Sequence, residues 1–235
     1  NKVLMYLYED VGRAHRNQIF KQEYSRTFSM LRNVFIEDMR LIFKDELNLL
    51  MISSDNLNKV NRKNPIVTIE MENSDIIKVE LMPEVAPNTV NNFISLINKG
   101  FYDGLIFHRV VKEFIIQGGS SNGNDTIDLD YCIDGEFASN NFENNLKHKR
   151  GVISMRTYKS SVVGSEFFIL LKDSPNLDGN YASFGKVIEG IEIVDKIATT
   201  TTDENEKPIE TQKIMKVTVD TFGKMYEEPK INNMR

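Results

Sequence analysis

The sequence predicts a mainly β domain, an antiparallel barrel or sandwich with a few helices, that follows an α-helical N-terminal segment. After Pro65, short apolar runs alternate with turn-forming residues, and within several runs apolar and polar residues alternate, which is typical of half-buried strands. Before residue 52, apolar residues instead recur every three or four positions, as they do on one face of a helix. The change of period near residue 60 therefore separates two kinds of structure.

The N-terminal segment, residues 1–52, is predicted to form two or three amphipathic helices. Val3 to Ile52 contains no proline and one glycine, so nothing in it interrupts helical spacing. The apolar residues with this spacing are Leu31, Val34, Phe35, Met39, Ile42, Phe43, Leu47 and Leu50. Residues 53–64, SSDNLNKVNRKN, are polar and turn-forming, and we interpret them as a linker.

The predicted β domain spans residues 65–225 and begins with a hairpin. In IVTIEM (66–71) and IIKVEL (76–81) every second residue is apolar, and ENSD between them suits a tight turn. Further strands are expected in the short apolar runs 105–110, 114–117, 152–155, 167–171 and 184–188, with the last at 213–222.

Two helices are expected within this domain. Pro87 suits a first helical turn, and Gly100 is placed to end the helix. One buried stripe is predicted from Val90, Phe93, Ile94 and Ile97. The second helix is expected in GIEIVDKIA, residues 190–198. The charged closing residues, 226–235, are predicted to form a flexible tail.

Composition excludes several classes of function. The net charge of −5 argues against nucleic acid and against anionic membrane surfaces, because both bind basic proteins. No apolar run approaches the roughly 20 residues that span a bilayer, so no membrane segment is expected. The single cysteine, Cys132, cannot form an intrachain disulfide, which favours a cytoplasmic location.

Motifs for metal and nucleophilic chemistry are not found. The three histidines are scattered, and with one cysteine they give no zinc-ligand spacing, so no metal site is expected. NDTIDLDYCIDGE (124–136) is acidic, but a solvated loop is favoured over a calcium site because Cys132 stands where a ligand would be needed. GSEFF (164–168) lacks the second glycine of a nucleophile elbow, so Ser165 is interpreted as a turn residue.

One arginine, Arg109, stands in a largely apolar run that ends on two glycines. This run, FHRVVKEFIIQGG (107–119), resembles the signature of cyclophilins, the peptidyl-prolyl cis/trans isomerases. The similarity continues through PNTVNNFISLINKG, GEFASNNFENNLKHKRGVISM and GSEFFILLKDSPNLDGNYASFGKVIEG, and covers residues 65 to about 223. The resemblance is to a bacterial-style single cyclophilin domain. It implies an eight-stranded antiparallel cyclophilin-like barrel, capped by two helices, with the active groove on its outer surface.

The resemblance gives Arg109 a chemical role. Rotation about a peptide bond has a barrier of about 18–20 kcal/mol, because the nitrogen lone pair is delocalised into the carbonyl group. In the twisted transition state the proline nitrogen regains this lone pair and can accept a hydrogen bond. A guanidinium held close to the nitrogen stabilises this state more than the planar ground state, which is the requirement for catalysis. This reaction needs no cofactor.

The resemblance also implies an apolar pocket for proline. It assigns Phe114, Ile115, Phe168 and Leu177 to the pocket, and Tyr181 to its rim. From the pattern alone, Phe114 and Phe168 would be interpreted as barrel core, because large aromatic residues in apolar strands are usually buried. In the family, the glutamine that matches Gln117 orients the arginine, and the histidine that matches His108 is interpreted as structural support.

Several residues depart from the family pattern. Arg156, Thr157 and Tyr158 stand where the family usually has small residues and an asparagine. Arg156 is expected either to narrow the groove or to favour acidic peptides. Glu166 replaces a usual glutamine, and it would pair either with Arg109, in competition with substrate, or with Arg156. In the family, a tryptophan associated with tight cyclosporin binding stands at the position of Asn176, so weak inhibition is expected.

The sequence therefore predicts a cytoplasmic peptidyl-prolyl cis/trans isomerase that acts on proline-containing peptides and on unfolded or folding proteins. The alternative is a weakly active or inactive module with the same fold that binds proline-containing peptides. The N-terminal helices match no family motif, and self-association or docking through them is the role left open for them.

Overall fold

The structure, a computed structural model, describes residues 63–120, 129–158 and 162–233. The chain divides into two units, Asn1–Arg62 and Lys63–Arg235. The predicted helical segment and all but the last two residues of the predicted linker lie outside the described residues. None of the helices in the described part of the chain has both the length and the apolar character needed to cross a membrane.

The domain begins with the predicted hairpin. Strands β1 (Ile66–Met71) and β2 (Ile76–Leu81) are antiparallel, with Val67 opposite Val79 and Ile69 opposite Ile77. The side chains of these four residues are fully buried, whereas the residues between them are partly exposed. The two-residue period therefore sets which face of the hairpin is buried.

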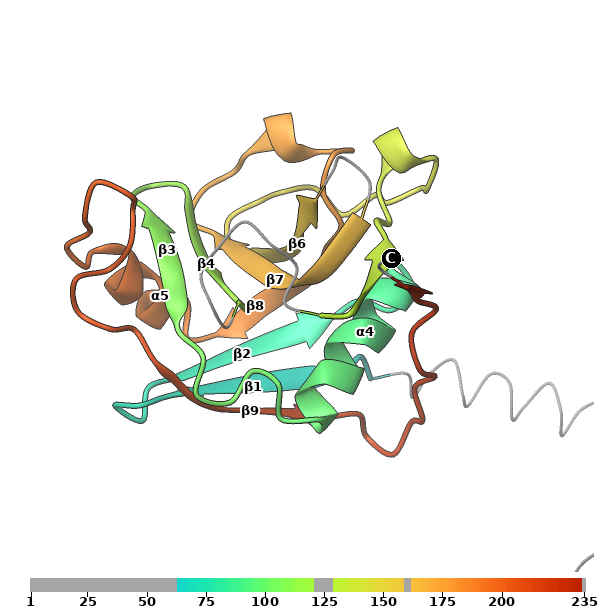
Figure 1. Ribbon diagram of the computed structural model, residues 1–235, viewed down its shortest axis with the longest axis horizontal. Helices are drawn as coiled ribbons and strands as arrows, with labels where there is room; N and C mark the ends of the chain where they lie inside the picture. Colours follow the sequence, from blue (N-terminus) through green and yellow to red (C-terminus); the bar gives the residue numbers. More distant parts are fainter. Residues whose placement is uncertain (1–62, 121–128, 159–161, 234–235) are drawn as a thin grey trace, which may run out of the picture. The chain divides into compact units, whose positions relative to one another are not determined.

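Eight strands of the described residues form one curled antiparallel sheet, in the order β9-β1-β2-β8-β6-β7-β4-β3 (Figure 1). The other six strands in this order are β3 (Phe107–Val111), β4 (Ile115–Gly118), β6 (Val152–Tyr158), β7 (Val162–Leu170), β8 (Ser183–Glu189) and β9 (Ile214–Asp220). Their bounds differ from the predicted runs by a few residues, except that β7 begins five residues before the predicted start at residue 167. The mainly β, antiparallel architecture is confirmed.

The two ends of this sheet meet where the chain enters β3 and β9. Ile106 and Lys213 form an isolated antiparallel bridge. The backbone N–H of Phe107 donates to Gln212 O (2.9 Å), and that of Ile214 donates to Leu105 O (2.8 Å). These contacts bring the end of the domain's chain against the strand that carries Arg109, although about 100 residues separate them in sequence.

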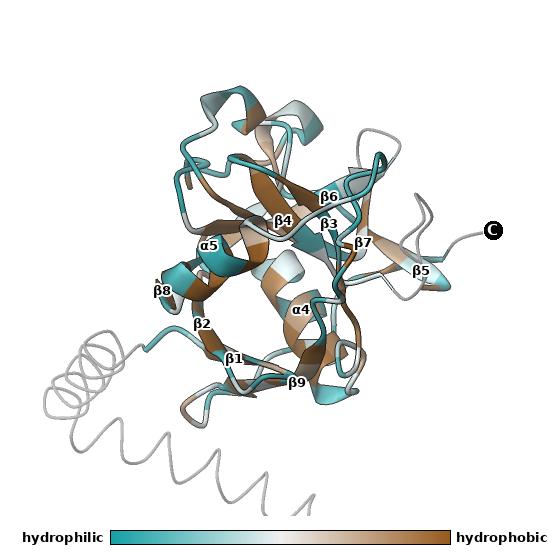
Figure 2. Ribbon diagram, turned by 90° about the vertical axis from the view of Figure 1, so that its left-hand side faces the viewer, coloured by the Kyte–Doolittle hydropathy of each residue, from teal (hydrophilic) through white to brown (hydrophobic). Residues whose placement is uncertain are grey.

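The two predicted helices lie at opposite ends of the sheet (Figures 1 and 2). Helix α4 (Pro87–Asn98) begins at Pro87, as expected, and buries Val90, Phe93, Ile94 and Ile97. Helix α5 (Ile191–Ala198) buries Val194, Ile197 and Ala198. Figure 2 shows hydrophobic residues concentrated on the strands around the interior and on the faces of the helices turned towards it.

The acidic run that was predicted to be a solvated loop has a structural role in its second half. Residues Tyr131–Asp134 form strand β5, which pairs with β7, and Glu136 is buried. The Glu136 carboxylate accepts the backbone N–H groups of Asn88 (3.0 Å) and Thr89 (2.7 Å). Because Ala86 offers no side-chain cap at the start of α4, Glu136 supplies the acceptor that the first turn of the helix needs. The solvated-loop prediction was therefore wrong for residues 131–136.

The interior is an aromatic and aliphatic core. Phe93 of α4 packs against Tyr102 (ring centroids 4.9 Å apart), Phe184 (5.0 Å) and Phe167 (5.5 Å). Phe168, the next residue of β7, belongs to a separate apolar cluster outside this core. This alternation along β7 gives the sheet two apolar faces, one in the interior and one on the outside.

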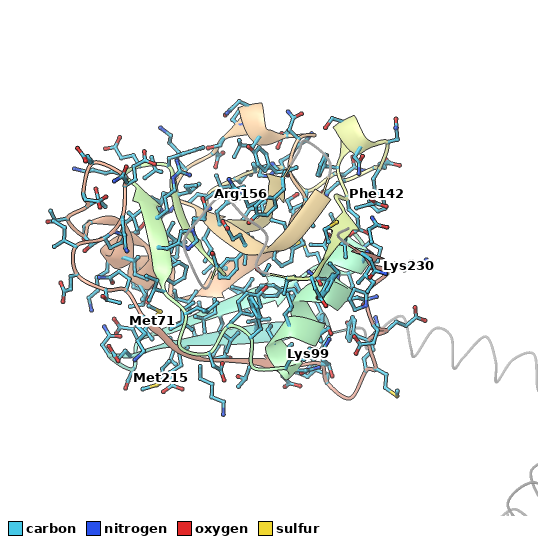
Figure 3. All side chains as sticks on the ribbon, viewed as in Figure 1. Met71, Lys99, Phe142, Arg156, Met215 and Lys230 are labelled. Carbon is cyan, nitrogen blue, oxygen red and sulfur yellow. The ribbon has the colours of Figure 1, made fainter. Side chains whose placement is uncertain are left out.

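Residues 226–233, which belong to the predicted flexible tail, are bonded to the rest of the domain. Asn232 and Asn233 form strand β10, which pairs with β5. The backbone of Lys230 exchanges two hydrogen bonds with the side chain of Asn88 (2.8 and 3.0 Å), and Ser95 donates to Glu228 (2.9 Å). Figure 3 places Lys230 beside α4. The polar side chains of this segment attach it to α4 and β5, a role that its charge alone did not indicate.

Candidate active site

The register of three neighbouring strands places Arg109 in a row with two other candidate residues. Arg109 of β3 lies opposite Gln117 of β4, and Gln117 lies opposite Phe168 of β7. Residues opposite each other in an antiparallel sheet point to the same face, so these three side chains share the outer face. The motif FHRVVKEFIIQGG therefore supplies two adjacent strands of one site.

The glycines that end this motif allow a tight path. Gly119 has a φ of +89°, and a Cβ placed there would lie 2.5 Å from the carbonyl oxygen of Ser165. Only glycine fits both the backbone conformation and the close approach to β7. The second glycine of IQGG thus keeps β4 close against the strand that carries Phe168.

The guanidinium of Arg109 is held on two sides. Its Nη1 donates to the side-chain oxygen of Gln117 (3.1 Å). Its Nε and Nη2 each lie 2.7 Å from Oε2 of Glu206, a residue in the loop between α5 and β9. The Arg109 side chain is 39% exposed, so it is open to solvent while its orientation is fixed.

Gln117 connects Arg109 to a buried carboxylate. Its Nε2 donates to Oε2 of Glu166 (2.6 Å), and Glu166 is only 2% exposed. An ionised carboxylate can only accept hydrogen bonds, so Gln117 turns its NH₂ group to Glu166 and its oxygen to Arg109. Glu166 therefore determines which end of the Gln117 amide faces the arginine.

The Glu166 carboxylate has further partners, and Arg156 is among them. The hydroxyl of Tyr158 donates to Glu166 Oε1 (2.6 Å), and Arg156 Nε lies 3.6 Å from Oε2. Burial, together with the hydrogen bond to Glu166, raises the pKa of Tyr158 well above its usual value. Of the two partners expected for Glu166, the structure places Arg156 at ion-pair distance, and Gln117 stands between Glu166 and Arg109.

His108 lies behind Gln117. It is 8% exposed, its Nε2 lies 3.5 Å from Gln117 Nε2, and among the described residues its Nδ1 has no hydrogen-bond partner. His108 therefore contacts the residue that holds Arg109, a position consistent with structural support.

The apolar candidates form one cluster on the outer face. It contains Ile115, Val152, Phe168, Leu170 and Leu177, with Val111, Phe114, Leu146 and Tyr181 partly buried against it. We call this set the outer apolar cluster. It holds every residue that was assigned to the proline pocket or its rim, and it is separate from the barrel core, where Phe114 and Phe168 would otherwise have been placed.

Phe168 is the aromatic centre of the outer apolar cluster. The Tyr181 ring meets it edge-on, with centroids 5.5 Å apart, and the His148 ring is stacked beside it at 6.5 Å. His148 is in turn fixed by Asp178, whose Oδ1 lies 2.9 Å from Nδ1, and by Ser154, whose hydroxyl lies 3.1 Å from Nε2. Burial lowers the pKa of His148, and Asp178 partly offsets this effect. A neutral imidazole that donates to Asp178 and accepts from Ser154 fits this network.

Arg156 and Thr157 lie at the end of β6, beside the row that carries Arg109. The guanidinium of Arg156 is 4.4 Å from the centroid of the Tyr158 ring, a cation–π geometry. Thr157 Oγ1 lies 3.4 Å from the carbonyl oxygen of Asn180, next to Tyr181. In the view of Figure 3, Arg156 lies in the upper half of the domain, and Met215 of β9 lies near its lower edge. Among the described residues, no group of three or more His, Cys, Asp or Glu side chains could hold a metal ion.

Sequence reasoning missed Glu206 entirely and named Tyr158 only as a departure from the family pattern. Glu206 is 97 residues from Arg109 in sequence, and no motif surrounds it. Tyr158 could have been found as the polar aromatic residue two positions after Arg156 on the same strand, although its bond to Glu166 depends on the register of β6 with β7.

A curled antiparallel sheet with a fixed arginine beside an apolar cluster on its outer face defines a class of protein, and three comparisons agree on it. Residues 66–219 match the family model described as cyclophilin type peptidyl-prolyl cis-trans isomerase/CLD. The peptidyl-prolyl cis-trans isomerase CYP18-2 of Arabidopsis thaliana is 36% identical over 156 residues, which cover 66% of this chain and 93% of that protein. Peptidyl-prolyl cis-trans isomerase B of Bacillus subtilis is 43% identical over 122 residues, or 52% and 82% of the two chains.

A solved structure is also similar. The crystal structure of a Cryptosporidium parvum cyclophilin type peptidyl-prolyl cis-trans isomerase, in the presence of the dipeptide Ala-Pro, matches with a TM-score of 0.59 and 32% identity. The match covers 66% of this chain and 98% of that one. The chain belongs to the cyclophilin-type peptidyl-prolyl cis-trans isomerase family, as its sequence predicts.

Proposed function

We propose that this chain, as its family membership implies, accelerates cis/trans rotation of Xaa-Pro bonds, with Arg109 as the electrostatic catalyst. The observation that carries this proposal is the row formed by Arg109, Gln117 and Phe168 across β3, β4 and β7. It sets a charged hydrogen-bond donor beside an apolar cluster on one face of the sheet. A prolyl bond needs both, because its ring is apolar and its nitrogen becomes an acceptor only when the bond twists.

Arg109 has donors left for this nitrogen. A guanidinium carries five N–H donors. Within the described residues Nε and one N–H of Nη2 face Glu206, and one N–H of Nη1 faces Gln117. One N–H on each terminal nitrogen therefore remains to meet the proline nitrogen. Because the twisted nitrogen accepts a hydrogen bond and the planar one does not, these donors stabilise the transition state selectively.

The outer apolar cluster is the proposed binding site for the proline ring. Phe168 and Leu177 are 4% and 8% exposed, whereas Phe114 and Tyr181 are partly exposed and can contact a ligand. Apolar contact of this kind binds the ground and transition states equally, so it contributes to affinity, while Arg109 contributes to the rate. Ile115, opposite Val111 and Leu170, adds an aliphatic side chain to the same face.

Arg156 and Thr157 are proposed to limit the groove at the end of β6. The charge of Arg156 is opposed by the buried Glu166 carboxylate at 3.6 Å. A narrowed groove is therefore better supported than a preference for acidic peptides, because the cation that would attract them already has a counter-charge. Asn176 is exposed and adjoins Leu177 of the cluster. Weak cyclosporin binding stays a proposal that rests on asparagine in place of tryptophan at this position.

The proposed substrates are proline-containing peptides and unfolded or folding proteins, and the reaction requires no nucleophile, general base, metal or cofactor. A reducing compartment such as the cytoplasm suits a chain with one cysteine. Self-association through residues 1–52 stays a proposal from the sequence, to be tested by sedimentation of the full chain.

The binding-module alternative has one specific observation in its favour. Glu206 occupies two of the nitrogens of Arg109 at 2.7 Å and so reduces what the guanidinium can offer a ligand. Exchange NMR on a short Xaa-Pro peptide separates the two functions. At catalytic amounts of protein, an isomerase broadens the cis and trans signals or gives exchange cross-peaks between them. A binding module shifts the signals only when it is present at amounts comparable to the peptide.

A further inference from the structure

Among the described residues, Glu206 is the one side-chain partner of the Arg109 guanidinium that lies outside the β3–β7 row. It belongs to the loop between α5 and β9, on the part of the chain that closes the sheet against β3. A single carboxylate oxygen, Oε2, meets both Nε and Nη2 of Arg109 at 2.7 Å. Hydrogen bonds between two charged groups are the strong ones, so this contact opposes rotation of the guanidinium about its terminal bonds.

The loop that carries Glu206 is built to hold it there. Thr202 and Pro208 form an antiparallel bridge, and inside it the carboxylate of Asp203 accepts the backbone N–H groups of Asn205 and Lys207, each at 2.9 Å. The backbone N–H of Glu206 donates to Asp203 O (3.1 Å). The turn therefore has its own network of hydrogen bonds before it meets the active site.

The backbone of Glu206 is also bonded to β3. Its carbonyl oxygen accepts the N–H of Val110, the residue next to Arg109, at 2.8 Å. Glu206 has a φ of +63°, a left-handed conformation that favours glycine and asparagine over glutamate. A strained residue that a surrounding network keeps in place, with its side chain on a candidate catalytic group, points to a function for that side chain.

We propose that Glu206 is a positioning residue for catalysis: it fixes the plane of the Arg109 guanidinium so that the two remaining N–H donors face the proline nitrogen. The proposal rests on the proposed isomerase function. Gln117 holds the guanidinium from the side of β4, and Glu206 holds it from the α5–β9 loop. With both contacts, a long and otherwise mobile side chain presents its donors in one geometry, so orientation does not have to be acquired during each turnover.

Glu206 has a second effect that opposes the first. Its negative charge weakens the field of Arg109 at the substrate, and if this effect dominated, Glu206 would inhibit the enzyme. We expect the positioning effect to outweigh the weakened field, because the carboxylate bonds only Nε and one N–H of Nη2 and leaves an N–H on each terminal nitrogen for the substrate. The two effects give opposite signs of activity change when Glu206 is replaced.

The test compares three variants of the full chain in the peptide exchange assay. Glu206→Ala removes the carboxylate. Glu206→Asn replaces it by a shorter, uncharged side chain that cannot pair with Arg109, and asparagine adopts the left-handed backbone conformation more readily than glutamate does. Both should lower kcat/KM by roughly 10- to 100-fold, mainly through kcat, because orientation of a catalytic group is lost and apolar binding is kept. The control is Glu204→Ala, an exposed glutamate in the same loop, which should behave like the wild type.

The Nε–H signal of Arg109 in ¹⁵N NMR spectra reports the contact without activity. It should be sharp and protected from exchange with water in the wild type and in Glu204→Ala, and broadened or lost in Glu206→Asn. Increased activity in both Glu206 variants, or an unchanged Arg109 signal in Glu206→Asn, would overturn the positioning role. If the wild type has no isomerase activity, the proposed function fails, and the Arg109 signal alone then decides whether Glu206 holds the guanidinium.

Discussion

Phe167 and Phe168 are adjacent in β7 but face opposite sides of the sheet, so they form a matched pair for testing the outer apolar cluster. Among the described residues, Phe168 has two aromatic neighbours, Tyr181 at 5.5 Å and His148 at 6.5 Å. Phe167 has three such neighbours in the interior, at 5.5, 5.7 and 6.1 Å. Replacing each phenylalanine by leucine keeps an apolar side chain of similar size and removes these ring contacts.

The two substitutions should differ in stability and, more sharply, in function. At about 0.5–1.5 kcal/mol for each aromatic pair, the free energy of unfolding should fall by about 1–3 kcal/mol in Phe168→Leu and by about 1.5–4.5 kcal/mol in Phe167→Leu. Urea unfolding measures this difference. Peptide exchange NMR, at temperatures where both variants are folded, should show a several-fold lower kcat/KM for Phe168→Leu and a value close to the wild type for Phe167→Leu.

Either of two results would contradict this expectation. If Phe167→Leu lost as much activity as Phe168→Leu, general loosening of the sheet would explain both, and the outer apolar cluster would not be the binding site. If neither variant lost activity while both were destabilised, the cluster would be a second structural core, as the sequence pattern alone allows for Phe168.

Two further predictions concern the polar groups around the site. Glu166→Gln removes the negative charge that pairs with Arg156. The affinity for peptides with glutamate before proline, relative to peptides with lysine there, should then rise by up to about fivefold, as measured by titration. This rise should be absent in the double variant that also carries Arg156→Ala. Protonation of His148 should destabilise the domain in acid. Burial lowers its pKa in the folded state, so its contribution to stability is full above the unfolded-state pKa of about 6.5 and is lost as the pH falls below that value. In the wild type, the midpoint of urea unfolding should fall as the pH is lowered through this range. In His148→Asn the midpoint should depend less on pH, and an equal dependence in both proteins would contradict the assignment.

Local patterns in the sequence predicted the elements that depend on local physics. The two-residue period predicted the β1–β2 hairpin, and the helical stripe predicted the buried face of α4. The family resemblance around Arg109 predicted Gln117 as its partner, and the two residues lie opposite each other on adjacent strands of one hairpin. These predictions needed contacts only between residues close in sequence, or a family motif that already contains them.

The features that were missed depend on contacts between distant segments. Glu206 reaches Arg109 across 97 residues, and Glu136 caps α4 across 47 residues, so no sequence window contains both partners. Acidic composition indicated solvent exposure for Glu136, but two backbone N–H groups at the helix start offset the cost of its burial. The choice of Glu166 between two arginines also depended on register, because Gln117 fills the space between it and Arg109.

The most direct test of the central claim is cis/trans exchange in a short Xaa-Pro peptide, measured by NMR with the wild type, Arg109→Ala and Arg109→Lys. Catalytic amounts of the wild type should accelerate exchange, and Arg109→Ala should lose roughly 10²- to 10³-fold of this acceleration. Arg109→Lys should recover little, because a lysine ammonium cannot reproduce the fork held by Gln117 and Glu206. Equal acceleration by the wild type and Arg109→Ala would contradict the claim that this guanidinium catalyses the rotation.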